Sequence, residues 1–373
     1  MKTTPTEALE IALYVPPLDL AAVNAARCTA YRLKCLGEWK DTGLGHTKLG
    51  LLQKDPFTRR QDRILKKYQL VKHFHTWIPA REEWHDPGKI NNLNVDPWFT
   101  DGSGINHCFG AGIFGPKDDY RESIPMGSHS TVFSAEILAI LKCTEHLLTK
   151  NTIGRKINIC SDSRAAILVL AKTTTESSLV WDCMLALEKL SRANKVILVW
   201  VPGHQGIPGN EIADTLAKEG ASKAPTGPIA GVPFAVGKET IRSHLSREHL
   251  IKWETSKSCR QAKLLMKNTN VSRTNELLTM SRQRLRVAVG LLTGHSSLLS
   301  AHLFNLGLAE RRECHLCGDE REDSVHLLYH CPSLLHRRYR IWGRMFLNPP
   351  DLGTVRVVDL LSLVLGTRLA PNT

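Results

Sequence analysis

Four carboxylates and one histidine stand beside Gly, Ser or strand-like runs within one domain's length of this 373-residue chain. In chain order they are Asp101, Glu136, Asp162, His204 and Asp214. Carboxylate oxygens are the ligands that hard cations such as Mg²⁺ prefer, and two such cations can stabilise both sides of an in-line phosphoryl displacement. In the same region no Ser or Cys stands with a base that would make it a nucleophile. The residue types therefore predict metal-dependent phosphoryl transfer.

Each acid also has a simpler interpretation when it is taken alone. Asp101 precedes Gly102, as turn aspartates often do, and Glu136 at the start of a helix would compensate the helix macrodipole. Asp162 would serve as an N-cap between a strand and a helix, and Asp214 would be a surface acid. If all four simpler interpretations held, the order of the surrounding motifs would be a coincidence, so we favour the catalytic hypothesis.

Hydrophobic periodicity indicates the elements that must position these residues. Strands joined by turns are predicted around Trp98–Thr100 and at Gly110–Phe114, and a helix over Val132–Leu148. Later segments alternate between strand and helix: Lys156–Cys160, Arg164–Leu170, Leu179–Leu190, Val196–Val201 and Glu211–Gly220, the last closed by its glycine. Hairpin strands followed by alternating helices and strands predict an α/β domain, in which a mixed sheet carries helices on its faces.

The motifs around the acids and the histidine resemble, in their order, those of the type 1 ribonuclease H family, which cuts the RNA strand of an RNA–DNA hybrid. They are Phe99-Thr100-Asp101-Gly102-Ser103, Ser134-Ala135-Glu136, Ser161-Asp162-Ser163, Pro202-Gly203-His204-Gln205-Gly206 and Asn210-Glu211-Ile212-Ala213-Asp214. The resemblance covers residues 96–222, about a third of the chain. It implies a ribonuclease H-like mixed sheet of five strands with helices on both faces.

The resemblance also implies a role for each residue. Asp101 would bridge two Mg²⁺ ions, with Mn²⁺ as a possible substitute, and Glu136 would bind one of them near the RNA 2′-hydroxyl. Asp162 and Asp214 would complete the two sites. His204 would assist proton movement or product departure from a Gly- and Pro-rich loop that can act as a gate. A loop histidine with no catalytic role is the alternative.

A second group of metal-ligand residue types lies near the C-terminus. Three cysteines and one histidine have the types and spacing of a tetrahedral zinc site: Cys314, Cys317, His326 and Cys331. Four protein ligands leave no open position, so the predicted ion is structural rather than catalytic. His315 and His330 are competing ligands, and chance spacing of buried cysteines is the alternative. The ten cysteines show no evenly spaced disulfide framework, which fits a reducing compartment.

The net charge of +13 is unevenly distributed. Residues 93–222 contain 12 Lys and Arg and 14 Asp and Glu, whereas residues 225–345 contain 19 and 10. Bacterial-type ribonucleases H grip the hybrid with an additional basic helix and loop, and none stands between residues 192 and 196. We therefore expect the basic C-terminal half to bind nucleic acid. The alternative is that the excess charge only aids solubility.

The flanking segments resemble parts of non-LTR retrotransposon polyproteins of the jockey-like type. Residues 3–10 and 33–37 resemble the region after the polymerase palm, and Leu292–His295 with His302 resemble the segment ahead of the C-terminal zinc knuckle. No Tyr/Phe-x-Asp-Asp polymerase motif occurs. The predicted divisions are a thumb-like helical remnant at 1–45, a basic connector at 46–92, a ribonuclease H domain at 93–222, a basic helical linker at 223–300, a zinc-knuckle region at 301–345 and a tail at 346–373.

Within these divisions the sequence predicts further helices. Thr6 would cap a helix over Glu7–Leu13, and Leu20–Leu36 has helical spacing. The segments Glu239–Lys267 and Thr274–Leu292 are predicted to be basic helices, and residues 355–365 a short helix or strand.

The predicted function is endonucleolytic hydrolysis of the RNA strand of RNA–DNA hybrids by a two-metal-ion mechanism. A catalytically inactive nucleic-acid-binding protein of the same fold is one alternative, and a DNA-directed nuclease such as an integrase-like enzyme is another. The Pro-Gly-His loop and the Asn-Glu-x-Ala-Asp motif favour ribonuclease H. No stretch is long and apolar enough to cross a bilayer, and no secretory signal is evident. We therefore expect an intracellular protein, in the nucleus or the cytoplasm, with no membrane partner.

Overall fold

The computed structural model describes residues 4–39, 47–85, 95–225, 230–318, 321–347 and 355–365. The chain divides into two compact units. We call Ala25–Ile241 the sheet unit, and Met1–Asn24 together with Arg242–Thr373 the helical unit. The boundaries between the units fall within helix α2 (Leu18–Cys35) and helix α8 (Phe234–Thr255). The six divisions predicted from the sequence are thus distributed over two units.

The sheet unit is built on a six-stranded mixed sheet with the strand order β2-β8-β6-β3-β4-β5. Strands β3, β4 and β5 form two antiparallel hairpins, and β6 runs parallel to β3, β8 to β6 and β2 to β8. The bounds are β2 (His75–Trp77), β3 (Pro97–Ile105), β4 (Cys108–Gly115), β5 (Tyr120–Gly127), β6 (Lys156–Ser161) and β8 (Lys195–Trp200). The predicted mixed sheet is confirmed: the predicted domain, residues 93–222, contributes five strands, and β2 adds a sixth from outside that domain.

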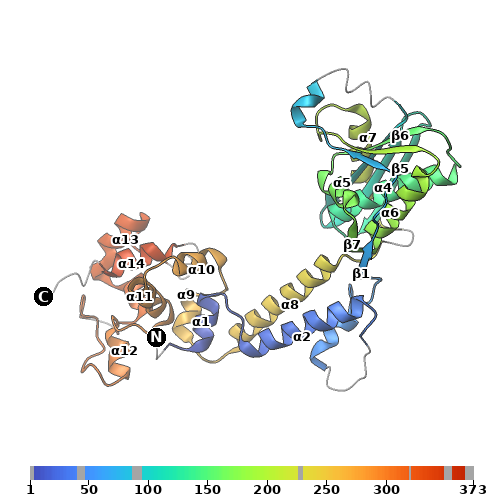
Figure 1. Ribbon diagram of the computed structural model, residues 1–373. Coiled ribbons are helices and arrows are strands. Elements are labelled where there is room, and N and C mark those ends of the chain that lie inside the picture. Colours follow the sequence, from blue (N-terminus) through green and yellow to red (C-terminus); the bar gives the residue numbers. More distant parts are fainter. Residues whose placement is uncertain are drawn as a thin grey trace. The chain divides into compact units, whose positions relative to one another are not determined.

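Helices cover both faces of this sheet (Figure 1). One face carries α4 (Val132–Thr149), α5 (Arg164–Ala171) and α6 (Ser178–Ser191), and the other carries α7 (Pro208–Ser222). Alternate strand residues point to opposite faces. Trp98 therefore packs in the core under α4 to α6, whereas Phe99 packs in the core under α7.

Residues 47–85, which make up most of the segment predicted as an irregular basic connector, are folded, so this prediction is wrong for them. It contains η1 (Thr47–Gln53), β1 (Arg63–Tyr68), β2 and η2 (Arg81–His85). Strand β1 pairs antiparallel with β7 (Thr174–Ser177). Asp62, just before β1, accepts hydrogen bonds from the Ser178 hydroxyl at 2.8 Å and from the Leu179 amide at 2.7 Å. Local pattern does not reveal β1 and β2, because both strands obtain their pairing partners from distant sequence.

The described residues of the helical unit share an apolar core to which segments from both ends of the chain contribute. Its helices are α1 (Thr6–Ala12), α9 (Arg260–Leu265), α10 (Val271–Leu278), α11 (Arg282–Thr293), α12 (Ser300–Asn305), η3 (His326–His330), η4 (Pro332–Leu334), α13 (Leu335–Trp342) and α14 (Val357–Leu365). The apolar segment at 355–365 forms a helix rather than a strand. The predicted cap of α1 is wrong: Pro5 is the N-cap, with no side-chain capping bond, and Thr6 is the first helical residue.

None of the helices in the described ranges combines the length and the apolar character that crossing a bilayer requires.

Candidate active site and metal centres

Strand β3 and helix α4 bring Asp101 and Glu136 together. Asp101 lies near the middle of β3, and both carboxylates are buried, with 5% and 4% of the residue surface exposed. A Cβ atom on Gly102 would lie 2.4 Å from the Glu136 backbone nitrogen. Only glycine therefore allows the helix to approach the strand this closely. The Thr131 hydroxyl caps α4 by accepting a hydrogen bond from the Ser134 amide at 3.1 Å.

Asp162 directly follows the last residue of β6, and its carboxylate does not cap the next helix. The N-cap of α5 is Ser163, whose hydroxyl accepts from the Ala166 amide, so the interpretation of Asp162 as an N-cap is wrong. The Asp162 carbonyl accepts a hydrogen bond from Trp200 Nε1 at 2.9 Å. Its carboxylate joins the first pair: one ligand oxygen from each of Asp101, Glu136 and Asp162 lies within 4.8 Å of the others.

The electrostatics of these three acids fit a divalent cation. Burial, followed by the negative charges of Asp162 and Asp214, raises the pKa of Asp101 to about 7. Burial and the charges of Asp101 and Asp162 raise the pKa of Glu136 well above its usual range. Within the part of the chain that the structure describes, no Lys or Arg forms an ion pair with any of the three. Three hard oxygen donors, of which Asp101 and Glu136 are buried and Asp162 is half-buried, without a cationic partner among the described residues form a site that Mg²⁺ suits.

Asp214 and His204 lie in a second, adjacent cluster. The ligand atoms of His204, Glu211 and Asp214 are within 4.8 Å of one another. His204 is exposed, with a positive φ of 54°, and Asp214 is half-buried and forms an ion pair of 2.5 Å with Lys218. The charge of Asp214 still raises the pKa of Asp101, so the two clusters interact. The structure therefore brings together three of the four predicted acids and places the fourth beside the predicted histidine.

Three polar residues of this site were given no role in the sequence analysis. Glu211 stands three residues before Asp214 on α7, a spacing that puts both on one helix face. The Ser161 hydroxyl donates to Glu136 Oε2 at 3.3 Å, and Asn210 Nδ2 donates to Asp162 Oδ2 at 3.4 Å. Asn210 is 2% exposed. The signal that could have found Asn210 is an amide side chain at the buried start of a helix, since buried polar groups are usually hydrogen-bonded.

The packing of α7 corrects one further expectation. Gly220 was predicted to close this helix, but α7 continues to Ser222. A Cβ atom at Gly220 would lie 2.8 Å from the carbonyl oxygen of Ile124 in β5. Gly220 therefore allows the helix to lie close to the sheet rather than ending it.

The predicted zinc ligands meet in the helical unit. The ligand atoms of Cys314, Cys317, His326 and Cys331 lie within 4.8 Å of one another. Cys314 Sγ and Cys331 Sγ are 3.8 Å apart, and Cys317 Sγ is 3.4 Å from His326 Nε2. Zinc bonds of about 2.3 Å to sulfur and about 2.0 Å to nitrogen place tetrahedral ligands about 3.8 Å and 3.5 Å apart. Both distances fit zinc, and the sulfur separation is too long for a disulfide of about 2.05 Å.

Neighbouring groups hold these ligands in place. The backbone amides of Leu316 and Cys317 donate to the Cys314 sulfur, although burial raises the pKa of this thiol to about 12. His326 receives support from Asp323, whose Oδ1 accepts from the His326 amide at 2.9 Å. A metal ion would reverse the raised thiol pKa, because it binds the thiolate.

The structure also distinguishes His326 from the competing histidines. The ring Nδ1 of His315 forms a 2.6 Å hydrogen bond with the buried carboxylate of Glu322. His330 is exposed and lies outside the cluster.

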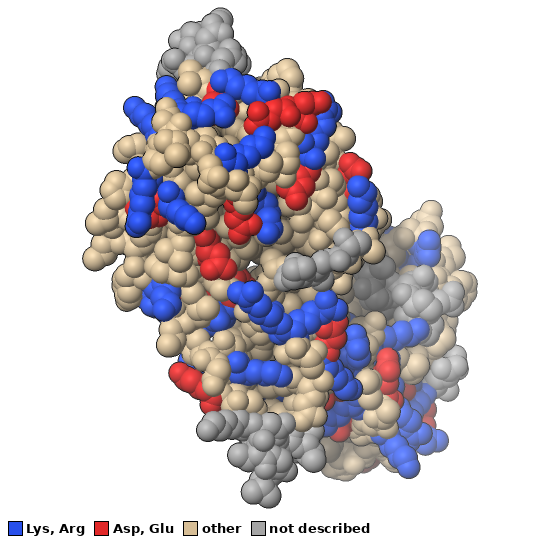
Figure 2. Space-filling model, turned by 90° about the vertical axis from the view of Figure 1, so that its right-hand side faces the viewer, with Lys and Arg blue, Asp and Glu red and all other residues tan. Residues whose placement is uncertain are grey.

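A comparison with protein-family models gives a match within the sheet unit. A family model described as RNase H matches residues 95–222. These residues contain β3 to β8 and α4 to α7, and their mixed sheet with helices on both faces is the ribonuclease H fold. The match supports a hydrolase that acts on RNA–DNA hybrids and therefore binds nucleic acid. Figure 2 shows Lys and Arg side chains spread over one face of the molecule, with Asp and Glu between them.

Proposed function

We propose that residues 95–222 hydrolyse the RNA strand of RNA–DNA hybrids with the help of two Mg²⁺ ions, for which Mn²⁺ can substitute. One observation carries the proposal: Asp101, Glu136 and Asp162 are gathered within 4.8 Å with no ion-pair partner among the described residues. Holding three like charges together, two of them buried, is costly unless a cation neutralises them. The family match over the same residues supports the hybrid as the substrate.

The residues divide into metal ligands and groups that orient them. Asp101, Glu136 and Asp162 would hold one position, and Asp214 would contribute to the second from α7. When bound, the ions neutralise charge on the scissile phosphate and lower the pKa of the attacking water. Ser161 orients the Glu136 carboxylate, and Asn210 orients that of Asp162. Loss of either would leave the ligand present but loosely held.

His204 has a different environment from the buried acids. It lies on an exposed turn in a loop rich in Gly and Pro, and its ring approaches Glu211 and Asp214. We infer that it moves a proton or assists departure of the product, and that it contributes less to holding the ions than Asp101, Glu136 and Asp162 do. Selection for RNA would rest on the 2′-hydroxyl, which DNA lacks.

The Cys314–Cys331 cluster is proposed to hold one structural zinc ion. Its four ligands leave no open coordination position, and their separations suit a tetrahedron. A ribonuclease H domain followed by such a cluster is the order that jockey-like retrotransposon polyproteins have, and this order supports a retrotransposon origin for the chain.

A substrate panel tests the proposed activity. The purified chain is incubated with an end-labelled RNA–DNA hybrid, duplex DNA, duplex RNA and single-stranded RNA, each with and without Mg²⁺. We expect cleavage of the RNA strand of the hybrid, dependent on Mg²⁺. Cleavage of duplex DNA in preference to the hybrid would instead indicate a DNA-directed nuclease. Hybrid binding without cleavage in Mg²⁺ or Mn²⁺ would indicate an inactive binding protein.

A further inference from the structure

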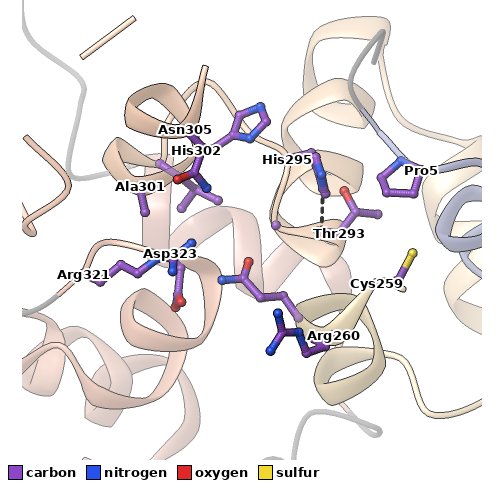
Figure 3. Close-up of a pocket in the computed structure, with 13 residues that line it drawn as sticks. Pro5, Cys259, Arg260, Thr293, His295, Ala301, His302, Asn305, Arg321 and Asp323 are labelled. Atoms are coloured by element: carbon purple, nitrogen blue, oxygen red, sulfur yellow. Dashed lines mark hydrogen bonds between the residues drawn. The ribbon is translucent and has the colours of Figure 1, made fainter. Parts of the chain in front are cut away.

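Two cavities of the helical unit share a pair of histidines. The first, of about 490 Å³, is lined by residues of α9, α12 and the segment after α11. The second, of about 820 Å³, is lined by the first half of α11 and by α12 and the residues after it. His295 and His302 line both. Figure 3 shows the first cavity, with Arg321 and Asp323 on one side and Arg260 and Cys259 on the other.

The sequence Thr293-Gly294-His295 fixes the first of these rings. Thr293 is the last residue of α11, and its buried hydroxyl donates to the Val289 carbonyl at 2.8 Å. Gly294 has a φ of 77°, the left-handed conformation that ends many helices. His295 follows, and its Nδ1 donates to the Thr293 carbonyl at 2.8 Å. A carbonyl oxygen can only accept, so the proton lies on Nδ1 and Nε2 remains an acceptor when the ring is neutral.

The second ring is positioned by the segment that carries the zinc ligands. Glu322, which is fully buried, accepts a hydrogen bond from the Ser300 hydroxyl at 3.0 Å, and its carbonyl accepts from the Ala301 amide at 3.2 Å. These bonds hold the start of α12. His302, on α12, then lies with its ring centroid 5.1 Å from that of His295, at an interplanar angle of 66°. Burial, with the neighbouring His295, lowers the pKa of His302 and favours a neutral aromatic ring.

Arginines surround this histidine pair. Arg260 and Arg321 line the first cavity, and Arg282 and Arg286 line the second. All four are exposed, and none forms an ion pair with an acid in the described part of the helical unit. Asp323 is the one carboxylate among the described lining residues. The cavities therefore favour a ligand with negative charge.

Apolar side chains line the second cavity beside the arginines. They are Leu285, Val287, Leu303, Leu306 and Leu308. Each cavity volume lies in the range of about 300–1,000 Å³ that accepts a compact organic group. A nucleotide combines a phosphate for the arginines with a flat base for the histidine rings and the apolar wall. An acidic peptide would supply the charge without the flat groups.

The two cavities that share His295 and His302 are called the His295–His302 groove. We propose that this groove binds a single strand of RNA or DNA. Phosphates lie against the arginines, and unstacked bases contact the histidine pair and the leucines. A duplex is excluded because its bases are stacked internally and cannot enter the cavities, whereas single strands bind proteins through aromatic rings and a basic groove. The groove belongs to the helical unit and uses none of the proposed metal ligands, so this binding activity goes beyond hybrid cleavage.

A matched pair of variants on α11 tests the proposal. Arg284 and Arg286 are both exposed on this helix, but only Arg286 lines the groove. Binding of fluorescein-labelled twelve-nucleotide oligo-dT and oligo-U to the zinc-loaded full chain is followed by anisotropy, without Mg²⁺, over a range of salt concentrations. We expect Arg286→Glu to weaken binding by about tenfold and to flatten the salt dependence by about 0.7 for each phosphate that is no longer neutralised. Arg284→Glu, with the same change of charge, should remain within about twofold of the parent.

A second pair of variants tests the role of the ring. His302→Ala should weaken binding by about fivefold or more, because the base can no longer stack on a ring at this position. His302→Phe should retain most of the affinity, and circular dichroism of both variants controls for folding. Equal effects of Arg284→Glu and Arg286→Glu would overturn the proposal. The proposal would also be overturned if a polyglutamate peptide displaced the oligonucleotides and bound with the same affinity as they do. Hybrid cleavage is assayed on the same preparations, so a loss of single-strand binding at the groove is distinguished from a loss of nuclease activity.

Discussion

A Cβ atom on Gly102 would lie 2.4 Å from the backbone nitrogen of Glu136. This backbone contact between β3 and α4 holds the Asp101 and Glu136 carboxylates in one site. We predict that Gly102→Ala forces the helix away, lowers the free energy of unfolding by about 1–3 kcal/mol and sharply reduces hybrid cleavage. Thermal melting and a cleavage assay measure the two effects. Gly50→Ala is the control, because a Cβ atom there meets nothing within 4 Å. Equal melting of both variants would contradict the prediction.

The raised pKa of Asp101, about 7, predicts how stability changes with pH. Between about pH 4 and pH 7 the folded, metal-free chain keeps a proton that the unfolded chain loses, so its stability should fall as pH rises through this window. Asp101→Asn cannot ionise and should melt at a higher temperature than the parent at pH 8 without added Mg²⁺. This difference should shrink towards pH 4. A variant that melts below the parent at pH 8 would show that burial and the neighbouring charges do not destabilise the ionised Asp101 carboxylate.

The same reasoning predicts the effect of the metal. Mg²⁺ should raise the melting temperature of the parent, because it binds only the folded site. It should stabilise Asp101→Asn much less, since one buried ligand has lost its charge. Differential scanning calorimetry with and without Mg²⁺ measures both proteins.

His204 is exposed, in contrast to the buried acids. We therefore expect its loss to lower the rate of cleavage rather than the binding of metal. His204→Ala should lower the turnover of hybrid cleavage by about 10²-fold or less, the lower range for one acid–base group. Binding of Mg²⁺ or Mn²⁺, measured by calorimetry, should remain. If metal binding disappears in this variant, the cluster of His204, Glu211 and Asp214 holds an ion in its own right and the assignment of His204 fails.

Cys317 tests the zinc proposal separately from the nuclease. Cys317→Ser should reduce the zinc content from one ion per chain to none and lower the melting temperature of the helical unit, because such small sites depend on metal to fold. Cys259→Ser is the control in the same unit, since Cys259 lies outside the ligand cluster. Zinc retained by the Cys317 variant at the parent level would refute the ligand set.

Much of the sheet unit was predictable from local pattern. Val132–Leu148 has a helical apolar stripe, and α4 spans Val132–Thr149; Val196–Val201 is an unbroken apolar run, and β8 spans Lys195–Trp200. Strand β2 was not predictable, because three residues show no periodicity and the strand exists only through its pairing with β8. The same holds for β7, whose partner β1 lies about a hundred residues earlier.

The site was predictable where a motif carried the chemistry. The order of the motifs predicted that Asp101, Glu136 and Asp162 come together, and spacing predicted the same for the three cysteines and His326 of the second cluster. The grouping of Asp214 with His204 was not, because it depends on how α7 and the preceding loop fold. Asn210 was also missed as an orienting residue, since its contact with Asp162 crosses 48 residues of sequence.

The central claim is that Asp162 is a ligand of the ions that drive hybrid cleavage, and one comparison tests it most directly. Asp162→Asn removes a charge in the site with little change in size, and Asp182→Asn makes the same substitution at an exposed position of α6. Rates of RNA cleavage in a labelled hybrid are measured in saturating Mg²⁺, with circular dichroism to verify folding. We predict that Asp162→Asn lowers the rate by orders of magnitude while Asp182→Asn remains within about twofold of the parent. Cleavage by a folded Asp162→Asn variant at the parent rate would contradict the claim.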